Sequence, residues 1–168
     1  MANKKTTTIT NAETNGGSIN AAHLVRGQLY AAGGVIAKAA DDTDTNVFRY
    51  FRVKSSDRIT SLRISNAALT GATDVDLGFY QIASAGGAVV SKDKLADGLS
   101  LASARANPTE VLGTGTNGVA VADQAKRVWE WLGLTADPGI EYDVALTFNT
   151  GGTAAGAIGV FADIASGN

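Results

Sequence analysis

The stretch RVKSSDRITSLRISNAALTGATDVDLGFYQ, residues 52–81, carries the clearest fold information in the chain. Apolar side chains alternate with polar ones over residues 62–64 and again over residues 75–79. Successive side chains of a strand point to opposite faces, so this period of two predicts two strands, each with one buried face. Residues 66–73 between them contain the Asn, Gly and Thr typical of a connection. We therefore predict two strands of an antiparallel sheet here, joined by a loop.

Further strands are indicated on both sides of this stretch. Residues 28–38 are apolar around a Gly-Gly pair, and residues 47–53 are rich in aromatic and β-branched side chains. Residues 141–149 and 158–164 alternate most regularly, and we predict that they pair as a hairpin across the loop between them. Small outward residues there, Ala145, Ala157 and Gly159, suggest that something packs on the second face.

The segment from Asp123 to Gly133 is the one convincing helix. Asp123 is a suitable N-cap, and Gly133 is suited to the left-handed stop. Val128, Trp131 and Leu132 fall on one face, which predicts packing against a sheet, although two tryptophans could also bind a ligand or sugar. With about seven or eight strands and this one helix, we predict an all-β fold, an antiparallel β-sandwich of jelly-roll or Greek-key type with a short α-helix near residues 123–133.

Composition indicates one globular domain. The chain has 168 residues, of which 45% are hydrophobic and 18% charged. We place a single β-sandwich domain at residues 28–168, preceded by a polar N-terminal arm at residues 1–27 that is flexible or bound to a partner. The net charge is −2 without a polybasic run, which argues against nucleic acid as a partner. The sequence has neither an apolar run long enough to span a membrane nor a secretory signal, so we expect no membrane partner.

No catalytic constellation is visible. The only histidine is His23, in the arm, and there is no cysteine. Asp74 and Asp76 share one face of a predicted strand, where solvation explains them as well as catalysis would. We expect a protein that is not an enzyme and has no cofactor.

Two motifs resemble ligand-binding sites only in part. Residues 113–118 spell G-x-G-x-x-G, but no βαβ unit surrounds them, so we interpret the segment as a Gly/Thr hairpin loop. Asp42, Asp44 and Asn46 match the first ligand positions of a calcium loop, but valines stand where the conserved Gly and Glu belong. We interpret these acids as a solvated turn and expect no metal.

Two groups of residues are candidates for partner contact. The first is a Thr-rich run with the β-propensity to add as a strand to a neighbouring subunit: Thr6, Thr7, Thr8, Ile9 and Thr10. The second is Arg49 and Arg52, which lie among aromatic residues. Such arginines are typical of subunit interfaces, and equally of edge strands, where they hinder aggregation.

About half of the chain resembles a known class of protein. The motifs are R-V-K-S-x-D-R-I at residues 52–59, D-V-D-L-G-F-Y at 74–80, a Gly-Gly loop at 86–87, W-x-x-L-G-L-x-x-D-P-G at 129–139 and Y-D-V at 142–144. Through these motifs the chain resembles small structural proteins of tailed-bacteriophage virions, which are described as capsid decoration or cement proteins. Residues 1–45 and 92–120 carry no such resemblance.

The resemblance implies a non-enzymatic subunit that binds the assembled capsid and bridges copies of the major capsid protein. It also implies self-association, preferably as a trimer, a place on the capsid exterior, and synthesis in the host cytoplasm. Two alternatives stay open. One is a carbohydrate- or receptor-binding β-sandwich with Trp129, Trp131 and Tyr80 as its platform, and the other is a tail or connector component.

Overall fold

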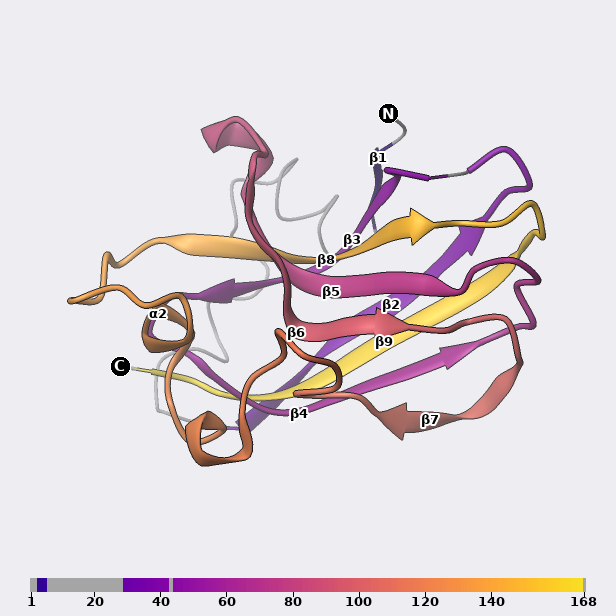
Figure 1. Cartoon of the computed structure of the whole chain (residues 1–168). Coiled ribbons are helices and arrows are strands. Elements are labelled where there is room, and N and C mark those ends of the chain that lie inside the picture. The colour runs from indigo at the N-terminus through magenta and orange to yellow at the C-terminus, as the bar shows by residue number, and fades with distance from the viewer. Residues whose placement is uncertain (1–2, 6–28, 43, 168) are drawn as a thin grey trace.

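Two facing β-sheets form the protein, as predicted (Figure 1). The computed structural model describes residues 3–5, 29–42 and 44–167, and every structural statement below concerns these residues. The candidate residues Thr6–Thr10 and most of the predicted arm lie outside them. No helix in the described ranges is long and apolar enough to cross a membrane.

The strand order within each sheet departs from the order along the chain. The five-stranded sheet runs β1 (Asn3–Lys5), β3 (Val47–Lys54), β8 (Glu141–Thr150), β5 (Asp74–Gln81) and β6 (Val89–Leu99). The four-stranded sheet runs β2 (Leu29–Lys38), β9 (Gly156–Ala165), β4 (Arg58–Asn66) and β7 (Arg105–Glu110). Apart from the parallel pair β1–β3, all pairs between these strands are antiparallel.

The predicted hairpin of residues 141–149 and 158–164 is wrong, because β8 and β9 lie in different sheets. β4 and β5 are strands with antiparallel partners, as predicted, but they also lie in different sheets. The connections of these two strand pairs, residues 67–73 and 151–155, instead pass from one sheet to the other and pack on each other. A Cβ added to Gly152 would lie 2.4 Å from the carbonyl oxygen of Thr70, so only a glycine allows this approach. Alternation shows which face of a strand is buried but not which sheet it joins, and two sheets both need inward-facing side chains.

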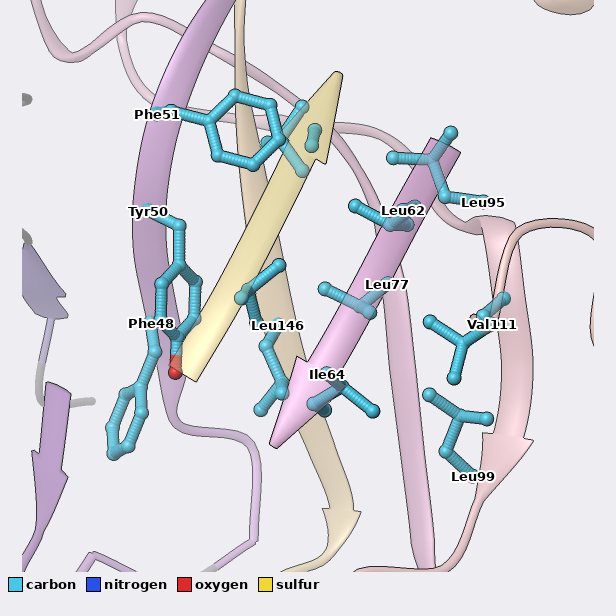
Figure 2. Close-up of a cluster of buried hydrophobic side chains, with 14 of the residues drawn as sticks. Phe48, Tyr50, Phe51, Leu62, Ile64, Leu77, Leu95, Leu99, Val111 and Leu146 are labelled. Atoms are coloured by element: carbon cyan, nitrogen blue, oxygen red, sulfur yellow. The ribbon is translucent and has the colours of Figure 1, made fainter. Parts of the chain in front are cut away.

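The core fills the space between the sheets. Phe48 and Phe148 meet edge to face at a ring-centroid distance of 5.2 Å. Figure 2 shows aromatic side chains of β3 beside aliphatic side chains of β4, β5 and β8. β5 and β8 are buried along nearly their whole length, on the outer face as well as the inner one. The five-stranded sheet is therefore covered on both faces over its central strands.

The predicted helix is much shorter than expected. Residues 121–123 form the 3-10 turn η3, and α2 spans only Val128–Trp131. The N-cap is Arg127, whose backbone N–H donates to Glu130 Oε2 at 2.8 Å, and not Asp123. Backbone N–H groups at the start of α2 donate to carbonyl groups of the β3–β4 turn instead of to a preceding helical turn. These bonds tie α2 to the sandwich, so the helix does not extend back to Asp123. The stop at Gly133, with a φ of 70°, is confirmed.

Candidate interaction surfaces

Arg49 and Arg52 are brought together on one buried carboxylate. Both extend from β3 to Asp143 on β8, with Arg49 Nη1 at 2.9 Å from Asp143 Oδ2 and Arg52 Nε at 2.9 Å from Oδ1. Asp143 is fully buried, and Arg49 is 1% exposed. Arg49 therefore links two strands inside the protein. The alternative prediction, an edge-strand arginine that faces solvent, is wrong for this residue. Partner contact by the two arginines stays a prediction, since the structure is that of one chain.

Arg49 also anchors a projecting segment, residues 82–90, which consists of the β5–β6 loop and the start of β6 and which we call the tip. Its guanidinium donates to the carbonyl oxygens of Gln81 at 2.8 Å and Gly87 at 2.7 Å, and lies over the ring of Tyr80. Sequence reasoning missed this role, because nothing in the sequence links Arg49 to a loop more than thirty residues away. A buried, charge-assisted anchor of this kind fixes the loop's position.

The tip is uncharged and exposed. Residues 82–90 read IASAGGAVV, and the short 3-10 helix η2 (Ala83–Ala85) forms their first turn. The loop stands away from the sandwich in Figure 1. Val89 is 57% exposed and Val90 40% exposed. Exposed valines on a fixed, charge-free projection are suited to contact with another protein, because interface cores are depleted of charge.

A second surface is the outer face of the four-stranded sheet, made by the outward side chains of β2, β9 and β4. The ring of Phe161 lies over Gly159 on this face, where a Cβ on Gly159 would be 2.8 Å from the ring. Ala157 is exposed beside it, as the small-residue pattern predicted. Ala145, by contrast, lies on the other sheet, fully buried in a small cluster with Val47 and Tyr80.

The proposed aromatic platform is not assembled. Trp131 and Tyr80 are each 5% exposed. Trp131 packs on Phe79 in the core, whereas Tyr80 lies on the opposite face of the sheet, with its hydroxyl 2.5 Å from Thr147 Oγ1. Burial raises the pKa of Tyr80, which keeps this phenol neutral. Trp129 on α2 is half-buried, so the predicted sugar-binding platform keeps one of its three rings.

The acidic residues singled out from the sequence have structural partners. Asp76 is 1% exposed, so the solvated interpretation is wrong for it. Its carboxylate accepts hydrogen bonds from the Gly98 N–H at 3.1 Å and from Asn149 Nδ2 at 2.7 Å, and it lies 3.3 Å from Lys92 Nζ. These contacts tie β6 and β8 to β5. The carboxylate of Asp76 therefore has a structural role, because it holds these three strands together.

The acidic turn before β3 is also structural. Asp42 is 4% exposed and accepts a hydrogen bond from the Ala39 N–H at 2.7 Å, so it is not solvated as expected. Asp44 accepts one from the Gly151 N–H at 2.7 Å, which ties the turn to the loop after β8. Across residues 3–5, 29–42 and 44–167, no group of three or more acidic or histidine side chains is arranged to hold a metal ion.

The G-x-G-x-x-G segment is a loop, as predicted, although it does not join two paired strands. The N–H groups of Thr116 and Asn117 donate to Asp97 Oδ2, each at 3.2 Å. A Cβ on Gly115 would lie 2.1 Å from the carbonyl oxygen of Asp97, so this glycine permits the close approach. The amides that would cradle a phosphate in a dinucleotide site are occupied by a carboxylate of the chain itself.

Comparisons with known proteins give a structural likeness only. No protein-family model and no curated protein matches the chain. A chain in the solved capsid of Ralstonia phage GP4 is similar, with a TM-score of 0.57 and 12% identity over 84% of this chain and 86% of that one. A chain of the cyanophage Pam1 capsid asymmetric unit aligns over 83% and 86% with 14% identity and a TM-score of 0.41. The first likeness shows that the fold occurs in a phage capsid.

Proposed function

We propose that the chain is a non-enzymatic structural protein of a tailed-bacteriophage virion that decorates the assembled capsid. One observation carries the proposal: the fold extends over 84% of this chain and 86% of a chain in the capsid of Ralstonia phage GP4. The sequence motifs that resemble capsid decoration proteins support it independently. In this role the protein lies on the capsid exterior, after synthesis in the host cytoplasm, and bridges copies of the major capsid protein.

The mechanism is stabilisation by mass action. A protein that binds only the assembled, expanded shell lowers the free energy of that state relative to every other state. Bridging of neighbouring subunits adds avidity, because the second contact of each copy is intramolecular. The role needs exposed contact surfaces and no catalytic group, and the tip and the outer face of the four-stranded sheet are surfaces of this kind. Self-association, with a trimer as the form implied by the resemblance, belongs to the same proposal.

Cosedimentation with capsids of the phage that encodes the chain tests this function. We expect binding to expanded shells and little binding to unexpanded ones. In the tip, Val90→Asp introduces a charge at a 40% exposed residue, and we expect it to weaken binding by about tenfold, or about 1.4 kcal/mol. Leu134→Asp is the matched control, since Leu134 is 39% exposed but outside the tip.

Equal loss in both variants would remove the tip from the interface. Binding to neither form of the shell would overturn the proposal and favour the tail, connector or sugar-binding alternatives.

The predicted arm has a separate test. Deletion of residues 1–20 should reduce capsid binding by at least about tenfold and leave thermal unfolding of the sandwich within a few degrees of the full chain. The deletion removes β1, which pairs with β3 through only three residues, so the loss in sheet pairing is small. A truncated chain that binds as well as the full chain would exclude the arm from capsid contact.

A further inference from the structure

Three side chains from three neighbouring strands meet on the outer face of the five-stranded sheet. They are Lys92 on β6, Asp76 on β5 and Asn149 on β8, and β5 lies between the other two strands (Figure 1). The backbone of β6 passes close to β5 where Gly78 has no side chain, since a Cβ there would lie 2.4 Å from the carbonyl carbon of Lys92. This arrangement brings an amine, a carboxylate and an amide into direct contact.

The amide of Asn149 is oriented by its hydrogen bonds. Its Oδ1 accepts a hydrogen bond from Lys92 Nζ at 2.6 Å. Its Nδ2 donates to Asp76 Oδ2 at 2.7 Å and to Asp74 Oδ1 at 3.1 Å. The carbonyl group of the amide therefore faces the amine, and the amide nitrogen faces two carboxylates.

One oxygen of Asp76 touches both nitrogen atoms. Asp76 Oδ2 lies 2.7 Å from Asn149 Nδ2 and 3.3 Å from Lys92 Nζ. The side chain of Asp76 is 2% exposed, and its other oxygen accepts a hydrogen bond from the Gly98 N–H at 3.1 Å. A carboxylate fixed in this way can exchange protons with an attacking amine and with a leaving amide nitrogen, which is the task of a general acid–base group.

We propose that Lys92 and Asn149 form an isopeptide bond, in a reaction that the chain carries out once on itself with Asp76 as the catalytic residue. The side chain of Lys92 is 45% exposed and so keeps the freedom to rotate from the carbonyl oxygen of Asn149 onto its carbonyl carbon. Because the amine is already held beside the amide, this rotation replaces an encounter between two separate groups. A lysine amine is a nucleophile only after it has lost its proton, and the carboxylate in contact with it can accept that proton.

The reaction balances without any further reagent. Asp76 Oδ2 takes a proton from the Lys92 ammonium, and the neutral amine attacks Cγ of Asn149 to form the new C–N bond. Asp76 then gives this proton to Nδ2 and takes a second proton from the attacking nitrogen, and the Cγ–Nδ2 bond breaks. The products are a secondary amide and ammonia, which accepts the proton left on Asp76 and departs as ammonium.

The bond would secure a strand that is otherwise loosely paired. β6 lies at the border of its sheet and shifts register three times against β5, and its first residues belong to the tip. A link from Lys92 to Asn149 spans β5 and joins positions 57 residues apart in the sequence, so it restricts the unfolded chain as a disulfide does. The bond is independent of the proposed function, since it forms within one chain and without a capsid.

The first test is the intact mass of the full chain. After incubation at about pH 9, where more of the lysine amine is neutral than at pH 7, we expect a chain that is lighter by one ammonia molecule. Two further titratable groups lie nearby, Asp74 and Tyr80, and the Tyr80 phenol keeps its proton because burial raises its pKa. Lys92→Arg keeps the cation without a nucleophilic amine and should retain its full mass. Lys94→Arg, on the same strand, is the matched control and should lose ammonia as the native chain does.

The second test locates the bond by peptide mapping, which is needed because an Asn-Gly pair such as Asn117-Gly118 can also lose ammonia by cyclisation. Trypsin does not cut after an acylated lysine, so the bond predicts a peptide of residues 64–94 joined to one of residues 128–168. Asp76→Asn keeps the shape of the side chain but cannot accept the proton, and it should slow formation of the joined peptides at least about tenfold.

Three outcomes would overturn the proposal. A native chain that keeps its full mass has no such bond, and neither has a chain that loses ammonia without yielding the joined peptides. Equal loss of ammonia in Lys92→Arg would assign the loss to another site. Formation of the joined peptides in Asp76→Asn at the native rate would overturn the catalytic role given to Asp76.

Discussion

Arg49 shows how one buried side chain links the sandwich to its surface. Its guanidinium joins the carboxylate of Asp143 on the neighbouring strand to the carbonyl groups of Gln81 and Gly87 at the base of the tip. The sequence pattern placed Arg49 correctly in a strand rich in aromatics. It could not show the partner, because Asp143 lies 94 residues further on and becomes a neighbour only through the pairing of β3 with β8.

Replacement of Arg49 should be costly. Arg49→Met leaves Asp143 buried with Arg52 alone and removes the donor from two carbonyl groups, and we expect a loss of about 3 kcal/mol in the free energy of unfolding. Arg63→Met is the control, because Arg63 and Asp163 form a pair that is 40% and 31% exposed and should contribute at most about 1 kcal/mol. Urea unfolding measures both. Similar losses in the two variants would contradict the role assigned to Arg49.

The tyrosines make stability sensitive to alkaline pH. Burial raises the pKa of all four, Tyr30, Tyr50, Tyr80 and Tyr142, above the ordinary value. Below about pH 10, folded and unfolded chains both hold these protons, and the contribution to stability is fully present. Above that pH the unfolded chain releases protons that the folded chain keeps, so stability falls as pH rises.

An alkaline titration followed by ultraviolet absorbance checks this. We expect tyrosinate to appear together with the loss of near-ultraviolet circular dichroism, at a pH above about 10. Appearance of tyrosinate near pH 10 while the dichroism is unchanged would contradict the burial of these rings.

At the scale of elements, local pattern predicted the strands well and their partners poorly. The alternation over residues 62–64 and 75–79 identified β4 and β5 and their inward faces, yet the strands belong to different sheets. The alternation of apolar and polar residues also did not predict that the outer face of β5 is buried. On that face Asp76 accepts hydrogen bonds from Asn149 and from the backbone of β6. Strand partners and second-face burial are set by contacts distant in sequence, which a period of two does not encode.

Gly78 tests the close pairing of β5 with β6. A Cβ at this position would lie 2.0 Å from the carbonyl oxygen of Ser91, and a backbone group cannot rotate away as a side chain would. We expect Gly78→Ala to lower the free energy of unfolding by about 3 kcal/mol, as overpacking does. Gly98→Ala is the comparison: its Cβ meets nothing within 4 Å, and only its φ of 67° opposes the change, at a cost of about 1 kcal/mol. A milder effect at Gly78 than at Gly98 in thermal unfolding would contradict the observed approach of β6.

At the scale of the molecule, fold class followed from composition and periodicity, and the β-sandwich is confirmed. The interaction surfaces could not be predicted from composition and periodicity. The tip was visible in the sequence only as a Gly-Gly loop at residues 86–87, since its fixation depends on Arg49. A surface of this kind has no sequence motif, because its property is what neighbouring elements leave exposed.

Capsid decoration is the central claim, and electron cryo-microscopy of expanded shells incubated with the purified chain tests it most directly. The account predicts regular additional density on the outer surface, at fixed lattice positions between major capsid subunits, into which the β-sandwich fits. Shells whose outer surface shows no such density, at a concentration of the chain that saturates binding in cosedimentation, would contradict it.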